Sequence, residues 1–397
     1  MKYLIIGNGV AGTTAAESIR KLDHSGEITI VTEENTPFYS RIRLIEYLAG
    51  EAQEKDIVIH AKEWYEKNNI RLHLASHVSL IDSEAKEAVI TTGERLSYDR
   101  LLLATGGISF IPPITGSDRQ GVFALRTIID ADKIIRFAEG KKKIVVIGGG
   151  VLGLEAANSL RKRGHDISVV EFFPRLLPRQ MDTEGAEVLK AQMESMGFSF
   201  YLGTKIKEIS GDEQVTGVFL EDGTMIDGDL VIVSAGVRAQ AELAGKLNLT
   251  VKKGITINDR METEKEGIFA AGDVIEHRGI FYGIWPAAQQ QGEVAGTNMA
   301  GGDTFYEGTT MSNVLKVAGI DLAAAGDIDA DGQFQSISHK DSDTFIYKKL
   351  VIKDNVLSGC ILYGDITGYR EILKAIDEKK DVSGIMDRLE NWDLGAL

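Results

Sequence analysis

Apolar runs and helical patterns alternate at the start of the chain. The run KYLIIG at 2–7 enters a glycine-rich turn, and a helical pattern follows through Ile19. A second apolar run, EITIV, occupies 27–31. A strand, a helix and a second strand in this order predict a parallel sheet that is covered by helices.

The same pattern starts again about 140 residues later, where KKKIVVIGGG is followed by a helical segment and by the strand DISVVE. Such a repeat indicates an internal duplication. Each copy is followed by a predicted hairpin and a buried strand. The first copy has AVITTGERLSYDRLLLATG, and the second has VFLEDGTMIDG, turning at Asp222-Gly223, and then DLVIVSAG. The prolines at 112 and 113 favour an extended connector between the copies.

The pattern changes from about residue 308. The segments TFIYKKLVIK and VLSGCILYG flank Asp354-Asn355 and predict an antiparallel hairpin, and TGYREILKAIDEKK predicts a helix after it. These elements indicate a small α+β domain at the C-terminus.

Composition limits the possible partners. The 397 residues are 43% hydrophobic and 26% charged, with a formal net charge of −15. Nucleic acids and anionic membranes are bound through basic patches, so neither is expected as a partner. The sequence has no apolar stretch of about 18 residues and no signal-peptide pattern, which predicts a cytoplasmic protein.

Cysteine and histidine usage argues against thiol and metal chemistry. Cys360 is the sole cysteine and lies in an apolar predicted strand, where we expect it to be buried and structural. His73 and His77 are four residues apart, but RLHLASHVSL alternates like one strand, which would place them about 13 Å apart. We therefore expect no metal site.

The first glycine motif predicts a dinucleotide site. Gly7, Gly9 and Gly12 follow a strand and open a helix, where glycines permit the tight turn, the approach of a pyrophosphate and close helix packing. The helix N-terminus presents N–H groups to the phosphates. Glu33 and Glu34 follow the second strand, where an acidic residue can bind ribose hydroxyls.

The second motif repeats this arrangement with Gly148, Gly150 and Gly153, and Glu171 closes the next strand. A carboxylate there can bind the 2′-hydroxyl of NADH and would repel the 2′-phosphate of NADPH. We therefore predict a preference for NADH, although Glu171 could also be a solvated strand end. Two dinucleotide sites in one chain suggest that one cofactor is retained and the other exchanges.

The motifs together resemble the FAD- and NAD(P)H-dependent pyridine nucleotide-disulfide oxidoreductase superfamily over essentially the whole chain. Within it, the chain most resembles NADH:rubredoxin oxidoreductases and the flavin portion of the assimilatory nitrite reductase large subunit. The resemblance implies FAD at the first motif and NADH at the second. It implies further FAD contacts by Arg41 in FYSR, Thr105 and Gly106 in LLLATG, Arg126 in ALRT, Asp273 in IFAAGDV, and Trp285 before Pro286. It also places the backbone of Val78 against the adenine.

The resemblance also places Glu155, in GLEAA, near the nicotinamide as the candidate catalytic residue, and Gly236, in SAGVR, at the end of the NAD unit. Structural interpretations remain open for several of these residues. Arg41 could be a surface charge, Asp273 a turn residue, Trp285 a core side chain and Glu155 a partner of the helix dipole.

The chain departs from its relatives in two places. YSRIRLIEYLAG lacks the redox cysteines that disulfide reductases carry after the first unit, so electrons cannot leave through a thiol relay. Glu46 occupies the position of a lysine that lies close to the flavin in some ferredoxin reductases, and a carboxylate there would disfavour an anionic reduced flavin.

We therefore predict an α/β protein with two Rossmann-like domains, the FAD domain being interrupted by the NAD domain, and a small α+β C-terminal domain. The predicted FAD-binding domain comprises 1–112 and 242–307, the NADH-binding domain 113–241, and the C-terminal domain 308–397. The predicted function is hydride uptake from NADH and electron transfer to a small carrier such as rubredoxin.

Two other functions remain open. One is an NADH-dependent flavoenzyme that reduces oxygen or serves as the flavin subunit of a larger redox complex. The other is a flavin-bound redox sensor or scaffold. The sequence leaves the acceptor and the choice between monomer and dimer undecided.

Overall fold

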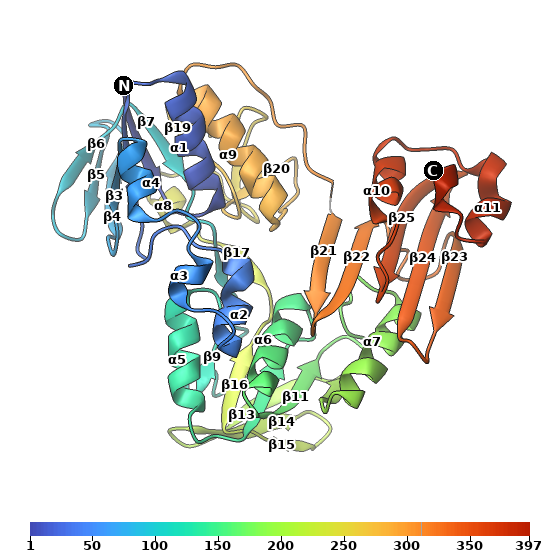
Figure 1. Ribbon diagram of the computed structural model, residues 1–397. Coiled ribbons are helices and arrows are strands. Elements are labelled where there is room, and N and C mark those ends of the chain that lie inside the picture. Colours follow the sequence, from blue (N-terminus) through green and yellow to red (C-terminus); the bar gives the residue numbers. More distant parts are fainter. Residues whose placement is uncertain (311) are drawn as a thin grey trace. The chain divides into compact units, whose positions relative to one another are not determined.

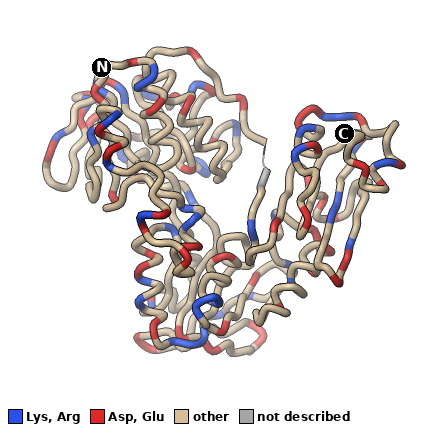
Figure 2. The backbone as a smooth tube through the Cα atoms, viewed as in Figure 1, with Lys and Arg blue, Asp and Glu red and all other residues tan. Residues whose placement is uncertain are grey.

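The computed structural model describes residues 1–310 and 312–397, and it divides into two compact units. The first unit comprises Met1–Arg43, Gln53–Phe110 and Gly236–Thr309. The second comprises Leu44–Ala52, Ile111–Ala235 and Thr310–Leu397. Figure 2 shows acidic and basic positions interspersed along the backbone of both units. Among the described residues, no helix has the length and apolar character needed to cross a membrane.

The first unit is built on a five-stranded parallel sheet (Figure 1). In spatial order its strands are β19 (Ile268–Ala270), β7 (Arg100–Leu103), β1 (Lys2–Ile6), β2 (Glu27–Val31) and β3 (Ile70–His73). After their charged first residues, β7 and β1 are apolar and buried, because helices cover the sheet, as the parallel arrangement requires. The predicted βαβ opening is confirmed.

Helices α1 (Val10–Leu22) and α9 (Trp285–Met299) pack side by side in this unit (Figure 1). Small residues make this close approach possible. A Cβ atom at Gly292 would lie 2.4 Å from the carbonyl oxygen of Ala11, and one at Gly296 would lie 2.3 Å from that of Ala15. The packing of α9 on α1 fixes the position at which α9 begins.

The remaining elements of the first unit are short. They are β4 (Val78–Asp82), β5 (Glu87–Ile90), β6 (Arg95–Ser97), β8 (Gly107–Ser109), β17 (Val237–Ala239), β18 (Ile255–Ile257), β20 (Ile275–His277), α3 (Glu54–Ile57), α4 (Lys62–Lys67), α8 (Glu242–Lys246) and a 3-10 turn at Arg41–Arg43. The segment predicted as one strand at 71–80 is instead divided between β3 and β4. The chain turns between them at Ala75, which has a φ of +49°.

The second unit repeats the first in its strand order. Its parallel sheet runs β12 (Ser199–Leu202), β11 (Asp166–Glu171), β10 (Lys143–Ile147), β16 (Leu230–Val233) and β9 (Val122–Phe123). The order of β12, β11, β10 and β16 matches that of β3, β2, β1 and β7. Each copy also has a three-stranded antiparallel sheet, which here comprises β13 (Ile206–Gly211), β14 (Val215–Leu220) and β15 (Met225–Asp227). The predicted internal duplication is confirmed.

Four helices accompany this second sheet. They are α2 (Leu44–Ala49), α5 (Ile128–Ala138), α6 (Val151–Lys162) and α7 (Thr183–Ser195). Helix α2 comes from far earlier in the chain and packs against α5 and α6. Tyr47 donates a hydrogen bond to Asp132 at 2.6 Å, and the hydroxyl of Ser159 donates to the carbonyl of Ile45 at 2.8 Å.

The C-terminal part of the second unit is a five-stranded antiparallel sheet. Its order is β21 (Ser312–Val317), β22 (Ile320–Gly326), β25 (Val356–Tyr363), β24 (Ile346–Lys353) and β23 (Gln335–Asp341), followed by α10 (Tyr369–Asp377) and α11 (Met386–Glu390). The predicted hairpin and helix are confirmed. Asp354 and Asn355 have φ values of +52° and +65°, as the tight turn between β24 and β25 requires.

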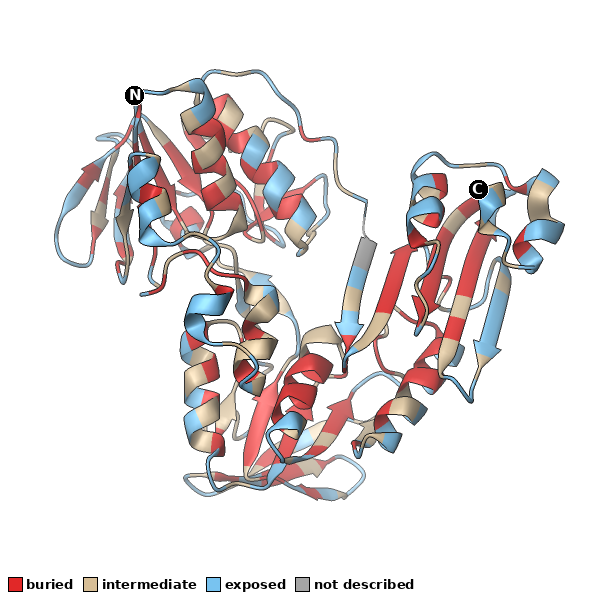
Figure 3. Ribbon diagram, viewed as in Figure 1, coloured by how far each residue is buried: buried red, intermediate tan, exposed pale blue. Residues whose placement is uncertain are grey.

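Both faces of this C-terminal sheet are covered. One face, which includes Leu350 and Leu362, forms a core with α10 and α11. The other, which includes Tyr347 and Ile361, shares a single core with α6, α7 and the second parallel sheet. Figure 3 shows the inner strands buried and β23 largely exposed. The C-terminal sheet and the second Rossmann-like sheet therefore form one packed body.

Candidate functional site: two glycine cradles

The first glycine turn is open at its middle residue. Gly7 has a φ of +117°, and a Cβ there would lie 2.0 Å from the carbonyl oxygen of Ala104. A Cβ at Gly12 would lie 2.0 Å from the carbonyl oxygen of Gly7, whereas one at Gly9 would meet no atom within 4 Å. Gly9 is the N-cap of α1 and has no side chain to bond the first N–H groups. The turn therefore forms a cradle for an anion such as a pyrophosphate.

A buried amide beside this cradle has spare bonding capacity. The hydroxyl of Tyr65 donates to Oδ1 of Asn8 at 2.9 Å and accepts from the backbone N–H of Phe38 at 3.2 Å. The Nδ2 atom of Asn8 is buried and has no partner among the described residues. Buried donors normally have acceptors, so this atom fits a ligand that is rich in oxygen.

The structure separates the two acidic residues that follow β2. The carboxylate of Glu34 accepts from Arg41 at 2.5 Å and from the hydroxyl of Tyr39. Glu33 instead pairs with His77 at 2.5 Å, and both of these side chains are exposed. Glu34 and Arg41 therefore form one cluster at the carboxyl end of the sheet, where a ribose and a phosphate could be bound together.

Other predicted FAD residues lie in the same unit. Thr105 and Gly106 follow β7, and Asp273 closely follows β19, so these residues share the carboxyl edge of the sheet with Gly7. The hydroxyl of Thr105 donates to the carbonyl of Gln240 at 2.8 Å. Trp285 is the first residue of α9, with its ring 5.9 Å from that of Phe38.

Val78 and Gly236 also lie in the first unit. Val78 is the buried first residue of β4. Gly236 has a φ of +105° and open space at its Cβ position. Its carbonyl accepts a hydrogen bond from the N–H of Phe110.

The second glycine turn repeats the geometry of the first. A Cβ at Gly148 would lie 2.2 Å from the carbonyl oxygen of Ser234, and one at Gly153 would lie 2.1 Å from that of Gly148. The middle residue, Gly150, again has open space and is the N-cap of α6. This second cradle fits the pyrophosphate of a second dinucleotide by the same argument.

Glu171 is fixed at the edge of the second cradle. Its carboxylate accepts hydrogen bonds from the N–H of Gly149 at 2.6 Å and from that of Phe173 at 2.8 Å. The aromatic pair that follows, Phe172 and Phe173, is 59% and 48% exposed. Glu171 is therefore held in place by the backbone of the turn itself, rather than being a solvated strand end.

Glu155 lies one turn into α6 and is buried. Its carboxylate accepts a hydrogen bond from the N–H of Ala318 at 2.6 Å. Burial raises the pKa of Glu155 above its usual value, and the bond from Ala318 opposes this shift. Arg126 also lies in the second unit, just before α5, and its backbone N–H donates to Asp130. The structure thus places Arg126 in a different unit from the residues around the first cradle.

Cys360 is completely buried in β25, as predicted. Burial raises the pKa of its thiol to about 12. The thiolate form is therefore scarce at neutral pH, and a buried thiol of this kind is inert. Among the described residues, no three His, Cys, Asp or Glu side chains are grouped closely enough to hold a metal ion.

Sequence analysis missed the Asn8–Tyr65 pair and the contact between Glu155 and Ala318. The two partners are 57 residues apart in the first pair and 163 in the second. A motif describes neighbouring residues, so neither contact leaves a signal in it.

The two cradles define a protein that holds two dinucleotides, and comparison with known proteins agrees. Residues 1–292 match the model of the pyridine nucleotide-disulphide oxidoreductase family, and residues 312–380 match that of the rubredoxin NAD+ reductase C-terminal domain. The chain belongs to the pyridine nucleotide-disulphide oxidoreductase family. This confirms the predicted superfamily, the two Rossmann-like folds and the cofactor class of FAD with a pyridine nucleotide.

Individual relatives extend the comparison. The chain is 39% identical to a nitrite reductase [NAD(P)H] of Bacillus subtilis, covering 96% of this chain and 48% of that protein. It is 32% identical to the NADH-rubredoxin oxidoreductase of Clostridium acetobutylicum, covering 97% of this chain and 96% of that one. The crystal structure of the Clostridium enzyme superposes with a TM-score of 0.84, covering 98% of this chain and 99% of that one. The chain spans about half the length of the Bacillus relatives it matches.

Proposed function

We propose that the chain is an FAD-dependent oxidoreductase that takes hydride from NADH and passes electrons to a small carrier such as rubredoxin. The observation that carries this proposal is the pair of open glycine cradles in a chain whose single cysteine is buried. Similarity to the NADH-rubredoxin oxidoreductase over nearly the full length of both chains supports the acceptor. FAD, when bound, accepts a hydride from NADH and releases electrons one at a time.

The residues of the chain bind and orient the cofactors in this proposal. The first cradle, Asn8, Glu34 and Arg41 hold FAD, and the second cradle holds the pyrophosphate of NADH. Glu171 accepts hydrogen bonds from the adenosine ribose of NADH, and its charge excludes the 2′-phosphate of NADPH. No thiol takes part, because Cys360 is enclosed in the core of the C-terminal sheet.

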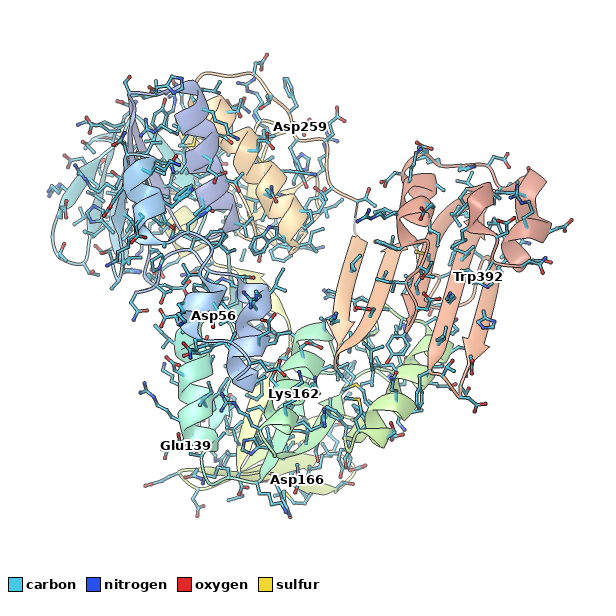
Figure 4. All side chains as sticks on the ribbon, viewed as in Figure 1. Asp56, Glu139, Lys162, Asp166, Asp259 and Trp392 are labelled. Atoms are coloured by element: carbon cyan, nitrogen blue, oxygen red, sulfur yellow. The ribbon has the colours of Figure 1, made fainter. Side chains whose placement is uncertain are left out.

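Cofactor preference tests the role of Glu171. A hydrogen bond to a charged group contributes about 1.5–3 kcal/mol, so kcat/KM should favour NADH over NADPH by roughly 10- to 150-fold. Glu171→Ala should abolish most of this preference, so that the kcat/KM values for NADH and NADPH become similar. Glu139→Ala, at an exposed carboxylate at the end of α5 (Figure 4), should leave it unchanged. Equal kcat/KM values for the two cofactors in the wild-type protein would show that Glu171 does not select NADH.

The electron acceptor is tested by rapid mixing without oxygen. NADH should bleach the flavin absorbance within the turnover time, and oxidised rubredoxin should then restore it. In a separate mixing experiment, air-saturated buffer should restore the absorbance of the reduced protein more slowly than rubredoxin does. Bleaching that takes many minutes would favour a redox sensor or scaffold instead. Rapid bleaching that rubredoxin fails to reverse would remove rubredoxin as the acceptor.

A second function has support of its own. The relatives from Bacillus subtilis include a nitrite reductase and an assimilatory nitrate reductase electron transfer subunit, at 39% and 36% identity. The chain could therefore act as the flavin-containing part that feeds another redox centre. Reoxidation by a partner redox protein, without acceleration by rubredoxin, would favour this function.

A further inference from the structure

A hairpin of the C-terminal sheet contacts the helix that begins at the second cradle. Strands β21 and β22 are joined at Ala318 and Gly319, whose φ values of +54° and +87° belong to a tight two-residue turn. Val317 is fully buried and Ala318 nearly so, in the same core as Leu154 of α6. The hairpin tip, defined as residues 317–320, is therefore packed into the NADH-binding half of the second unit.

One carboxylate connects this tip with the cradle. Glu155 lies five residues after Gly150, on the first turns of the helix whose N-terminus forms the cradle. One of its oxygens accepts the hydrogen bond from Ala318. The other accepts no hydrogen bond from the residues that the structure describes. At the opposite end of α6, Lys162 (Figure 4) pairs with Glu51 at 2.7 Å.

The C-terminal sheet has a second polar anchor, which keeps it in place independently of Glu155. Lys349 of β24 is buried and donates to Asp182 at 2.9 Å, and Tyr347 donates to the same carboxylate at 2.6 Å. Asp182 also caps α7 by accepting from the N–H of Gly185 at 3.0 Å. These contacts hold the sheet in place without the hydrogen bond from Ala318. The Ala318 bond can therefore serve to orient the side chain of Glu155.

We propose that the hairpin tip of the C-terminal domain is a positioning element of the NADH site, because it holds Glu155 where its second oxygen can accept the carboxamide N–H of the nicotinamide. This inference rests on the proposed function, and it gives the C-terminal domain a role in binding NADH. A buried carboxylate that already accepts a hydrogen bond from a backbone N–H loses less side-chain conformational entropy when it binds a second donor. The hairpin tip therefore favours NADH binding and leaves the FAD cradle in the first unit unaffected.

Two matched variants test this role in the full-length, FAD-loaded protein. Val317→Ala loosens the hairpin tip on the core shared with α6. Val382→Ala removes the same two methyl groups from an equally buried valine on the other face of the sheet, beside α10 and α11. Val317→Ala should raise KM for NADH about fivefold or more, the effect of one misoriented hydrogen-bonding group. Val382→Ala should stay within about twofold of wild type.

Amide exchange gives a second, ligand-independent readout. The N–H of Ala318 should exchange slowly in the wild-type protein and in Glu155→Gln, which keeps an acceptor oxygen, and faster in Glu155→Ala. Equal KM changes in the two valine variants, or slow exchange in Glu155→Ala, would overturn the proposal. If NADH does not bleach the flavin of the wild-type protein, the proposed function itself is wrong. If NADH bleaches the flavin of wild type and of both valine variants, but the two variants have equal KM values, only the role of the hairpin tip is wrong.

Discussion

Replacing Lys349 by methionine should destabilise the second unit much more than the same change at Lys348, its neighbour in β24. The ammonium group of Lys349 donates to Asp182 at 2.9 Å and to the carbonyl of Asp329 at 3.0 Å, and its side chain is 6% exposed. Methionine keeps the length of the side chain but leaves the Asp182 carboxylate without its cation. Breaking a buried pair in this way typically costs about 3–5 kcal/mol. Asp182 keeps its donors Tyr347 and Gly185, so we expect a value near 3 kcal/mol.

Lys348 points to the opposite face of the strand and pairs with the partly exposed Asp365 at 2.5 Å. Because the Asp365 side chain is 38% exposed, this pair should contribute less than the buried one, about 1 kcal/mol, so Lys348→Met is the matched control. The assay is urea-induced unfolding followed by far-UV circular dichroism, with the slope of the transition compared between variants. Because the C-terminal sheet shares a core with the second parallel sheet, both should unfold in one transition. Equal losses for the two lysine variants, or a separate transition for the C-terminal sheet, would refute this reasoning.

Three further predictions concern the cradle and the pH dependence of stability. Gly9→Ala should fold normally and lose flavin absorbance, whereas Gly12→Ala should lower the melting temperature, because its Cβ would lie 2.0 Å from a carbonyl oxygen; full flavin content in Gly9→Ala would contradict this. The hydrogen bond from Lys348 lowers the pKa of Asp365 to about 2, so the stability advantage of wild type over Asp365→Asn should be present at pH 7 and disappear as the pH falls from 4 to 2 in urea titrations. An advantage that persists at pH 2 would argue against the pairing. Burial raises the pKa of Glu155 above the usual glutamate value of 4.5, so ionisation costs more in the folded state. Wild type should therefore lose stability relative to Glu155→Gln as the pH rises above 4.5, and a pH-independent difference in melting temperature would contradict this.

The residues around the cradles show which features of the structure can be predicted from neighbouring residues in the sequence. The glycine turns, the strands beside them and the duplication were predictable because each depends on residues that are adjacent in the chain. Glycine spacing and the alternation of apolar runs are physical requirements of a strand–turn–helix unit, whatever surrounds it. The buried state of Cys360 followed in the same way from its apolar neighbours.

The tertiary structure decided which of several chemically similar residues share a site. The sequence offers Glu33 and Glu34 as equals, and only the folded chain shows that Glu34 contacts Arg41 while Glu33 pairs with His77. The sequence likewise presents the C-terminal segment as a separate domain, whereas the fold buries one face of its sheet against α6 and α7. Such contacts join side chains that are distant along the chain. They depend on the packing of whole elements, which no local pattern of residues records.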